Sequence, residues 1–349
     1  MAQWGVVSVR PHLAYSLLYG DGIQATLGQP VTTAIQTFSP GVLFGIGNHW
    51  SLDYTPTWTV YSSSAFRDTL DHSASLSGKA GYGDWTFGFS QSFVSASPVL
   101  VETGQQTKED VYITSLTATG SIDQHTFLDL ALTQNIRLAD AFTSSHEWST
   151  SDFLRYAFST QLDGSIGFDT GYVDVSAGPN MIYIRPELRV SWKPTNKVSL
   201  SVQGGGEHRQ FESGGIGAMN SPVYGATLQY QPVETTTLTL GANRDVSPSY
   251  FAGQVTRSTG WSAGFQQRLL QEFYFNANYE RGTTSYAATQ NNVDSGREDR
   301  NYEVTARLST TLLRRGTVAI LYQLSHNSSN TALYGFSSRQ IGLELGYRF

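Results

Sequence analysis

Apolar and polar residues alternate with a period of two along much of the chain. Ile341, Leu343, Leu345 and Tyr347 fall on one face of an extended C-terminal segment, and the residues between them fall on the other. The same alternation runs through residues 50–60, 182–193 and 273–280. Successive side chains of a β-strand point to opposite faces. The pattern therefore predicts strands with one apolar and one polar face.

Phe, Tyr and Trp recur on the apolar face, mainly near the ends of the predicted strands. A water-soluble sheet rarely repeats large aromatic residues so regularly on its outer face. Transmembrane β-barrels do, because they carry an apolar band between two aromatic girdles and enclose a polar interior. We therefore expect an all-β fold, a transmembrane antiparallel up-and-down barrel.

The connections between the predicted strands alternate between short turns and longer loops. Counting the segments gives about 18 strands in a single domain, residues 1–349, with no plug domain and both termini on the periplasmic side. A barrel of this width leaves an aqueous lumen, open or closed only by inward-folded loops. Deleting part of the loop predicted at Tyr286–Glu298 should raise conductance if that loop folds inward. Other long loops are predicted at Asp21–Thr33, Ser97–Gln106 and Val246–Gly253.

Composition supports this expectation. Charged residues make up 14% and aromatic residues 13%, yet the mean hydropathy is only -0.26, as expected when lipid-facing and water-facing residues alternate. No apolar run reaches the length of a transmembrane helix. No export signal is visible, so we expect it to have been removed from a protein of the bacterial outer membrane. The net charge of -6, without a basic tract, gives no indication of nucleic acid binding.

Four prolines do not fit the strand pattern. Pro11, Pro40, Pro56 and Pro186 lie inside or beside strand-like segments, although proline cannot donate to a sheet ladder. We expect them at bulges or strand ends.

No catalytic, metal or cofactor motif is visible. The seven His residues are dispersed, and Cys is absent. No helix pattern follows Gly204–Gly206, which argues against phosphate binding there. A Ser/His/Asp enzyme is recognised by geometry rather than by order in the chain, so it stays open, but nothing favours it.

Alternation also predicts which polar residues face the lumen. Both signs of charge occur there, so opposite charges should pair across neighbouring strands rather than form a ring of one sign. The surrounding Ser, Thr, Asn, Gln and Tyr residues suit a neutral polyhydroxylated solute. Two tyrosines in the set could stack on sugar rings or pack against loops. The candidates are Arg10, Asp53, Arg137, Arg155, Tyr183, Arg185, Glu187, Arg189, Glu207, Arg209, Tyr274, Glu280, Glu303, Arg307 and Glu344, with Asp129, Asp169 and Arg348 as further charged positions.

Several segments together resemble the outer-membrane porin family found in exopolysaccharide operons. They are Val9–Ser16 with Tyr19–Asp21, Leu52–Pro56 with Tyr61, Leu228–Thr236 with Arg244, Arg297–Arg300 and the terminal Phe349. Phe349 also resembles the signal read by the outer-membrane assembly machinery, although Glu344 stands where that signal commonly has Gly. The resemblance implies passage of a secreted polysaccharide beside a periplasmic polysaccharide-export protein.

We therefore expect a passive channel embedded among membrane lipids that passes exopolysaccharide through a wide polar lumen. The alternative is a general or substrate-selective diffusion porin for small hydrophilic solutes. A third possibility is a barrel that anchors a surface structure without conducting, or a surface enzyme.

Overall fold

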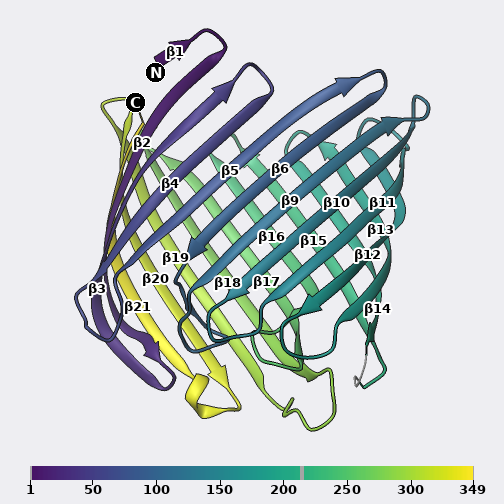
Figure 1. The fold of residues 1–349 in the computed structure, drawn as a ribbon. Coiled ribbons are helices and arrows are strands. Elements are labelled where there is room, and N and C mark those ends of the chain that lie inside the picture. Colours follow the sequence, from purple (N-terminus) through teal and green to yellow (C-terminus); the bar gives the residue numbers. More distant parts are fainter. Residues whose placement is uncertain (1, 213–215, 349) are drawn as a thin grey trace.

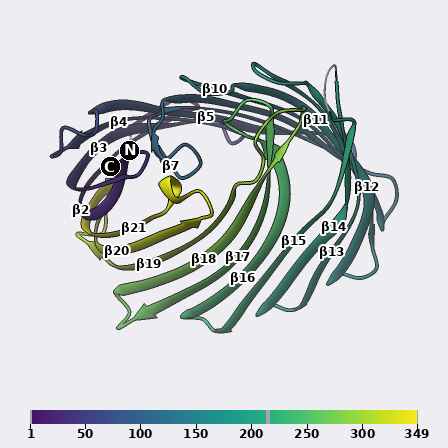
Figure 2. The same cartoon turned by 90° about the horizontal axis from the view of Figure 1, so that it is seen from below.

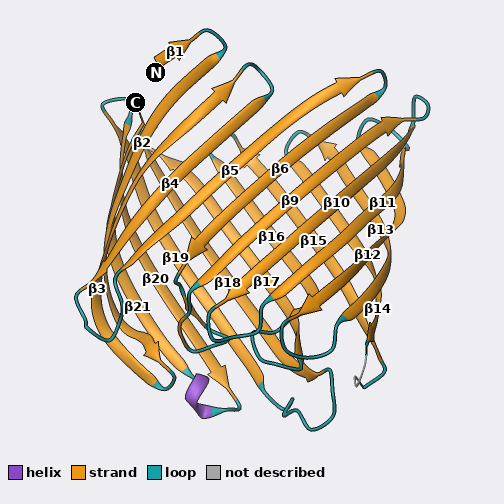
Figure 3. Ribbon diagram, in the orientation of Figure 1, coloured by secondary structure: helices purple, strands orange, loops and turns teal. Residues whose placement is uncertain are grey.

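The computed structural model describes residues 2–212 and 216–348. They form a closed antiparallel barrel of 18 strands, as the alternation predicts (Figures 1 and 3). Within these residues no helix is long and apolar enough to cross a membrane. The barrel strands are β2 (Val7–Thr26), β3 (Gln29–Ile46), β4 (Trp50–Tyr61), β5 (Thr69–Tyr82), β6 (Trp85–Ala96), β9 (Glu109–Ser121), β10 (Thr126–Ala139), β11 (Ser145–Ala157), β12 (Leu162–Val175), β13 (Met181–Thr195), β14 (Val198–Phe211), β15 (Ala218–Val233), β16 (Thr236–Pro248), β17 (Gln254–Leu269), β18 (Phe273–Ala288), β19 (Glu298–Leu312), β20 (Gly316–Ser329) and β21 (Phe336–Arg348).

Four short elements complete the fold. Strand β1 (Ala2–Trp4) pairs with residues 7–9 of β2, on the edge that β21 occupies from His12 onward. Strands β7 (Val99–Leu100) and β8 (Gln105–Gln106) form a small hairpin between β6 and β9, and the 3-10 helix η1 (Ala332–Tyr334) lies between β20 and β21. Phe349 lies outside the described residues, so its role as an assembly signal stays a prediction.

Both chain ends lie at the same end of the barrel, where the connections are short (Figure 1). The longer loops lie at the opposite end, which we call the outer mouth. Short turns on the periplasmic side and longer loops outside are the usual arrangement in bacterial barrels.

Strand β13 shows how alternate side chains face two different environments, lipid outside and the lumen inside. Its residues Ile182, Leu188 and Trp192 are 47%, 60% and 44% exposed on the outside of the barrel, whereas Tyr183 and Glu187 between them are buried. Exposed apolar side chains recur on the outer face of every part of the barrel. The outer surface is therefore suited to lipid and the inner surface to water.

Three predicted loops were partly wrong. Instead of a loop at Asp21–Thr33, β2 and β3 continue to a turn at Leu27–Gly28, where Gly28 has a φ of +74°. In place of the loop predicted at Val246–Gly253, β16 runs to Pro248. The loop predicted at Tyr286–Glu298 covers only residues 289–297. These segments lie near the outer mouth, where the outer face need not be apolar, and their apolar residues Ile23, Ala25 and Val246 are buried among inward-folded parts instead. Alternation is therefore lost although pairing continues.

The prolines lie inside strands rather than at the predicted bulges or strand ends, at places where the ladder on one side is interrupted. The β3–β4 register stops at Phe38–Trp58 and resumes at Val42–Tyr54, on either side of Pro40 and Pro56. Pro186 falls in a similar gap between β13 and β14. Pro11 lies where the neighbour of β2 changes from β1 to β21. In each place the ladder on that side needs no backbone N–H, so proline, which has none, is tolerated.

Near the outer mouth the barrel wall opens between β15 and β16. Their register reaches only Tyr224–Arg244, so residues 218–223 of β15 have no partner on β16. The outer ends of β16 and β17 turn inward instead (Figure 2). Val246 and Val255 from these ends pack against the inner face of β12–β15, on Val173, Met181, Tyr183, Phe211 and Met219. One side of the lumen is therefore filled by protein.

Candidate permeation pathway

The inner wall of β10–β14 carries neutralised charges. Arg155 lies 2.7 Å from Asp129 on β10, and Arg189 lies 3.4 Å from Asp169 on β12. Arg189 also lies 3.5 Å from Glu187 on its own strand. Opposite charges thus pair across neighbouring strands, as the sequence pattern indicated. These pairs leave little free charge on this wall for a passing ion.

A buried triad lies at the outer end of this wall. Glu207 accepts hydrogen bonds from Nε of Arg185 at 2.5 Å and of Arg209 at 2.6 Å. The Glu207 side chain is 0% exposed and that of Arg209 is 1% exposed. Both guanidinium groups also donate to the backbone oxygen of Val246 at 3.3 Å. The triad therefore anchors the inward-turned end of β16, and of its three side chains only Arg185 is partly exposed, at 20%.

Arg137 and Tyr183 contribute to the same anchoring. Arg137 donates to the carbonyl oxygens of Pro248 and Ser249, each at 3.2 Å. Tyr183 is 4% exposed and donates to Glu147 at 2.5 Å. Of the two roles considered for this tyrosine, the structure places it in packing against inward-folded segments. The two bonds from Arg137 satisfy carbonyl groups that have lost their sheet neighbour.

The β7–β8 hairpin folds into the barrel (Figure 2). On one side, Gln106 exchanges two hydrogen bonds of 3.0 Å with the backbone of Arg67 in the β4–β5 loop. On the other side, the Glu102 carboxylate accepts from Ser249 Oγ at 2.5 Å and from the Tyr250 backbone N–H at 2.8 Å. The hairpin is therefore fixed between two parts of the wall that lie far apart.

Arg297 completes a junction of loops over the outer mouth. It donates to the carbonyl oxygen of Glu102 at 2.8 Å and lies 3.3 Å from the ring centroid of Tyr334 in η1. Gln24 of β2 donates to the carbonyl oxygen of Leu333, also in η1, at 3.1 Å. Sequence reasoning missed this junction because its partners are separated by as many as 309 positions.

The junction should respond to pH through Glu102. Burial raises the pKa of its carboxyl group, while hydrogen bonds from Ser249 and Tyr250 and the charges of Arg137 and Arg297 act in the opposite direction. We call the hairpin docked when Glu102 contacts Ser249 and Tyr250. A raised pKa means that Glu102 holds its proton more tightly in the docked hairpin than in a detached one. Docking is therefore favoured below the ordinary pKa of glutamate and weakens as the pH rises through the raised value. We expect fewer open events in planar bilayers at pH 5 than at pH 8.

The control for this prediction is Glu102→Gln, which removes the titrating group but keeps a hydrogen-bond acceptor. The pH effect on opening should shrink in this variant. An equal pH effect in both proteins would assign the response to another group.

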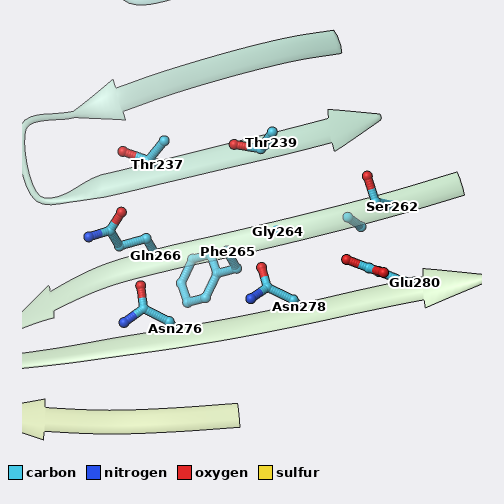
Figure 4. A pocket seen from close by; sticks show the side chains of 10 residues that line it. Thr237, Thr239, Ser262, Gly264, Phe265, Gln266, Asn276, Asn278 and Glu280 are labelled. Atoms are coloured by element: carbon cyan, nitrogen blue, oxygen red, sulfur yellow. The ribbon is translucent and has the colours of Figure 1, made fainter. Parts of the chain in front are cut away.

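The wall formed by β16–β18 has a different chemistry. A hollow of about 270 Å³ is lined mainly by hydroxyl and amide side chains, with one carboxylate (Figure 4). Gly264 in its floor leaves space beside Asn278, since an added Cβ there would lie 3.1 Å from the Asn278 Oδ1. The polar side chains of this hollow are Thr237, Thr239, Ser262, Gln266, Asn276, Asn278 and Glu280.

A second hollow, of about 210 Å³, lies between the β7–β8 hairpin and the wall of β19–β21. Val99, Leu100 and Val101 line it from the hairpin. Glu303, Gln323, Ser325, Ser338 and Gln340 are among the residues that line it from the wall. Ile23, Tyr302 and Phe336 line it as well, so the hollow is apolar on the hairpin side and mixed on the wall side.

The remaining candidates lie on the inner face near the end that carries the termini. Arg307 pairs with Glu344 at 2.7 Å, and Asp53 lies 3.9 Å from His12. Arg10 is exposed, and Tyr274 is the next inward residue of β18 below Asn276. The structure brings Arg185, Glu207 and Arg209 into one cluster and Glu280 beside Glu303 in register. Over residues 2–212 and 216–348, no group of three or more His, Asp or Glu could hold a metal ion.

Comparisons with known proteins agree with the barrel fold. Residues 190–349 match the family described as "Putative beta-barrel porin 2". Similar crystal structures are Pseudomonas aeruginosa OccK2 (OpdF) in complex with glucuronate (TM-score 0.52, 11% identity), Acinetobacter baumannii OccAB4 (0.51, 11%) and Pseudomonas aeruginosa OpdL (0.50, 14%). Each alignment covers 98% of both chains. A search among curated proteins finds no match.

Proposed function

We propose that this chain, a porin-type β-barrel of the bacterial outer membrane whose C-terminal part matches the beta-barrel porin 2 family, is a selective diffusion porin for small hydrophilic solutes. The inward-folded β7–β8 hairpin carries this proposal. It lies in the lumen beside the hollow of about 210 Å³ at β19–β21, which we take as the narrowest part of the pathway, while the ends of β16 and β17 fill another part of the lumen. A solute must therefore fit between the hairpin and the wall.

Export of exopolysaccharide, the function that the sequence resemblance implied, is less consistent with this geometry. A hydrated polymer needs a continuous wide path, whereas contacts from Glu102, Arg297 and Gln24 join loops across the outer mouth. None of the comparisons links the chain to a polysaccharide. A small solute can pass a constriction of fixed loops, because only a few water molecules have to be displaced at a time.

The test combines planar-bilayer recording with liposome swelling. Purified protein should give discrete conductance steps, and it should pass monosaccharides and amino acids more rapidly than oligosaccharides of increasing length. This size dependence follows from the narrow passage beside the hairpin. A denatured sample in the same vesicles controls for leakage.

Two results would contradict the proposal. An absence of conductance from correctly folded protein would favour a barrel that anchors a surface structure. If a long dextran crossed as rapidly as glucose, the result would favour passage of a polysaccharide over a selective diffusion porin.

A further inference from the structure

The two sides of the lumen differ in how their polar groups are used. On β10–β14 the charged side chains bond to one another or to inward-turned backbone, as the triad of Arg185, Glu207 and Arg209 shows. On β16–β18, none of the polar side chains that line the hollow in Figure 4 makes a side-chain hydrogen bond or ion pair with any residue in the described ranges. Their donors and acceptors face the lumen.

This polar surface continues towards the β7–β8 hairpin, although at its end Gln340 donates a 3.5 Å hydrogen bond to Ser338. Thr305 on β19 lies next to Asn278 in the register, and Gln323 on β20 lies next to Thr305. Gln340 on β21 follows, and it lines the second hollow together with Gln323. Strands lie about 4.8 Å apart, so the row spans about 24 Å. In order across six strands, the row is Thr239, Gly264, Asn278, Thr305, Gln323 and Gln340.

Amide and hydroxyl groups in this spacing suit sugar hydroxyls. An amide offers two donors and an acceptor, and a hydroxyl offers both roles, so each can replace the water bound to a hydroxyl of the solute. The apolar side chains of Val99, Leu100 and Val101 face the far end of the row. They would contact the C–H face of a sugar ring while its hydroxyls bond to the wall.

The charges beside the row disfavour anions. Glu280 and Glu303 are register neighbours on β18 and β19, one step nearer the outer mouth than Asn278 and Thr305. Within the described part of the chain, neither carboxylate has an ion pair, and Glu303 only accepts a 3.4 Å hydrogen bond from Ser325. Two uncompensated carboxylates repel a carboxylate or phosphate solute in this narrow space.

We propose that the row from Thr239 to Gln340 is a binding track for neutral sugars, which selects them over acidic sugars of the same size. The proposal deepens the proposed function, since it names the solute class and the wall that recognises it. The solute moves along the row by exchanging one set of hydrogen bonds for the next.

The test measures block of the ionic current by sucrose in planar bilayers. Sucrose should interrupt the current of the unmodified porin reversibly, and glucuronate at equal concentration should do so less. Asn278→Leu and Gln323→Leu should each raise the apparent Kd for sucrose about fivefold, the effect of losing one hydrogen bond of about 1 kcal/mol.

A matched pair of variants separates recognition from a general change in the lumen. Thr305→Leu lies in the track, whereas Thr133→Leu lies on the inner face of β10 and adds the same volume. Only Thr305→Leu should weaken the sucrose block. The double variant Glu280→Gln, Glu303→Gln should make glucuronate a better blocker.

Failure of the track and failure of the porin function give different results. Equal effects of Thr305→Leu and Thr133→Leu, or equal block by sucrose and glucuronate, would overturn the track while conductance persists. Loss of the porin function itself would show as absence of conductance in the unmodified protein.

Discussion

Replacing Val99–Gln106 by a short Gly-Ser linker is expected to raise the single-channel conductance several-fold. This segment forms the β7–β8 hairpin, which lines the narrow passage opposite β19–β21. Its removal also detaches Glu102 from Ser249 and Tyr250 and leaves Arg297 without its two carbonyl acceptors on the hairpin. Planar-bilayer recording of the variant and of the unmodified protein measures the change directly.

The same linker in place of Asp123–His125 serves as the control. That turn lies at the opposite end of the barrel, between β9 and β10, so the conductance should stay unchanged. Folding of both variants is checked by the slower gel migration of heat-denatured barrels. A folded hairpin deletion with unaltered conductance would show that the hairpin does not limit the pathway.

Glu207→Gln is expected to lower the free energy of unfolding by about 3–5 kcal/mol. The substitution leaves the guanidinium groups of Arg185 and Arg209 without their buried counter-charge, although the side-chain shape is nearly preserved. Both arginines also hold the carbonyl group of Val246, so the end of β16 should loosen. Urea unfolding in lipid vesicles gives the free energy.

Glu298→Gln is the matched control for this loss. Its partner Arg300 lies 2.9 Å away, but both side chains are well exposed, at 42% and 69%. Exposed ion pairs contribute about 1 kcal/mol or less. Similar losses in the two variants would mean that burial of the triad contributes nothing to stability.

Much of the fold follows from local pattern. Residues 182–192 show why: Ile182 and Leu188 meet lipid and Tyr183 and Glu187 face inward because neighbouring side chains of a strand take opposite directions. Strand number follows from counting such segments, and pairing between strands adjacent in sequence follows from short turns. The predicted loop at Asp21–Thr33 failed because pairing there continues beyond the region where alternation is required.

The candidate pathway was only partly predictable. Alternation placed Arg185, Glu207 and Arg209 on the inner face, but it gave no reason to expect that they anchor a strand end. Likewise it placed Glu280 and Tyr274 inward without indicating that Asn278, Thr305 and Gln323 form a continuous row. The row depends on the register of several strands, which single-strand patterns do not specify.

The barrel, its number of strands and the polar character of the lumen follow from the alternating pattern along the chain, since each depends on whether a residue meets lipid or water. Only the tertiary structure decided the width and shape of the passage. That shape comes from contacts such as Arg137 with Ser249 and Glu102 with Tyr250, whose partners lie 112 and 148 positions apart. Contacts of this kind arise when the closed barrel brings distant loops together. The periodicity of the chain does not predict them, because it depends only on neighbouring residues.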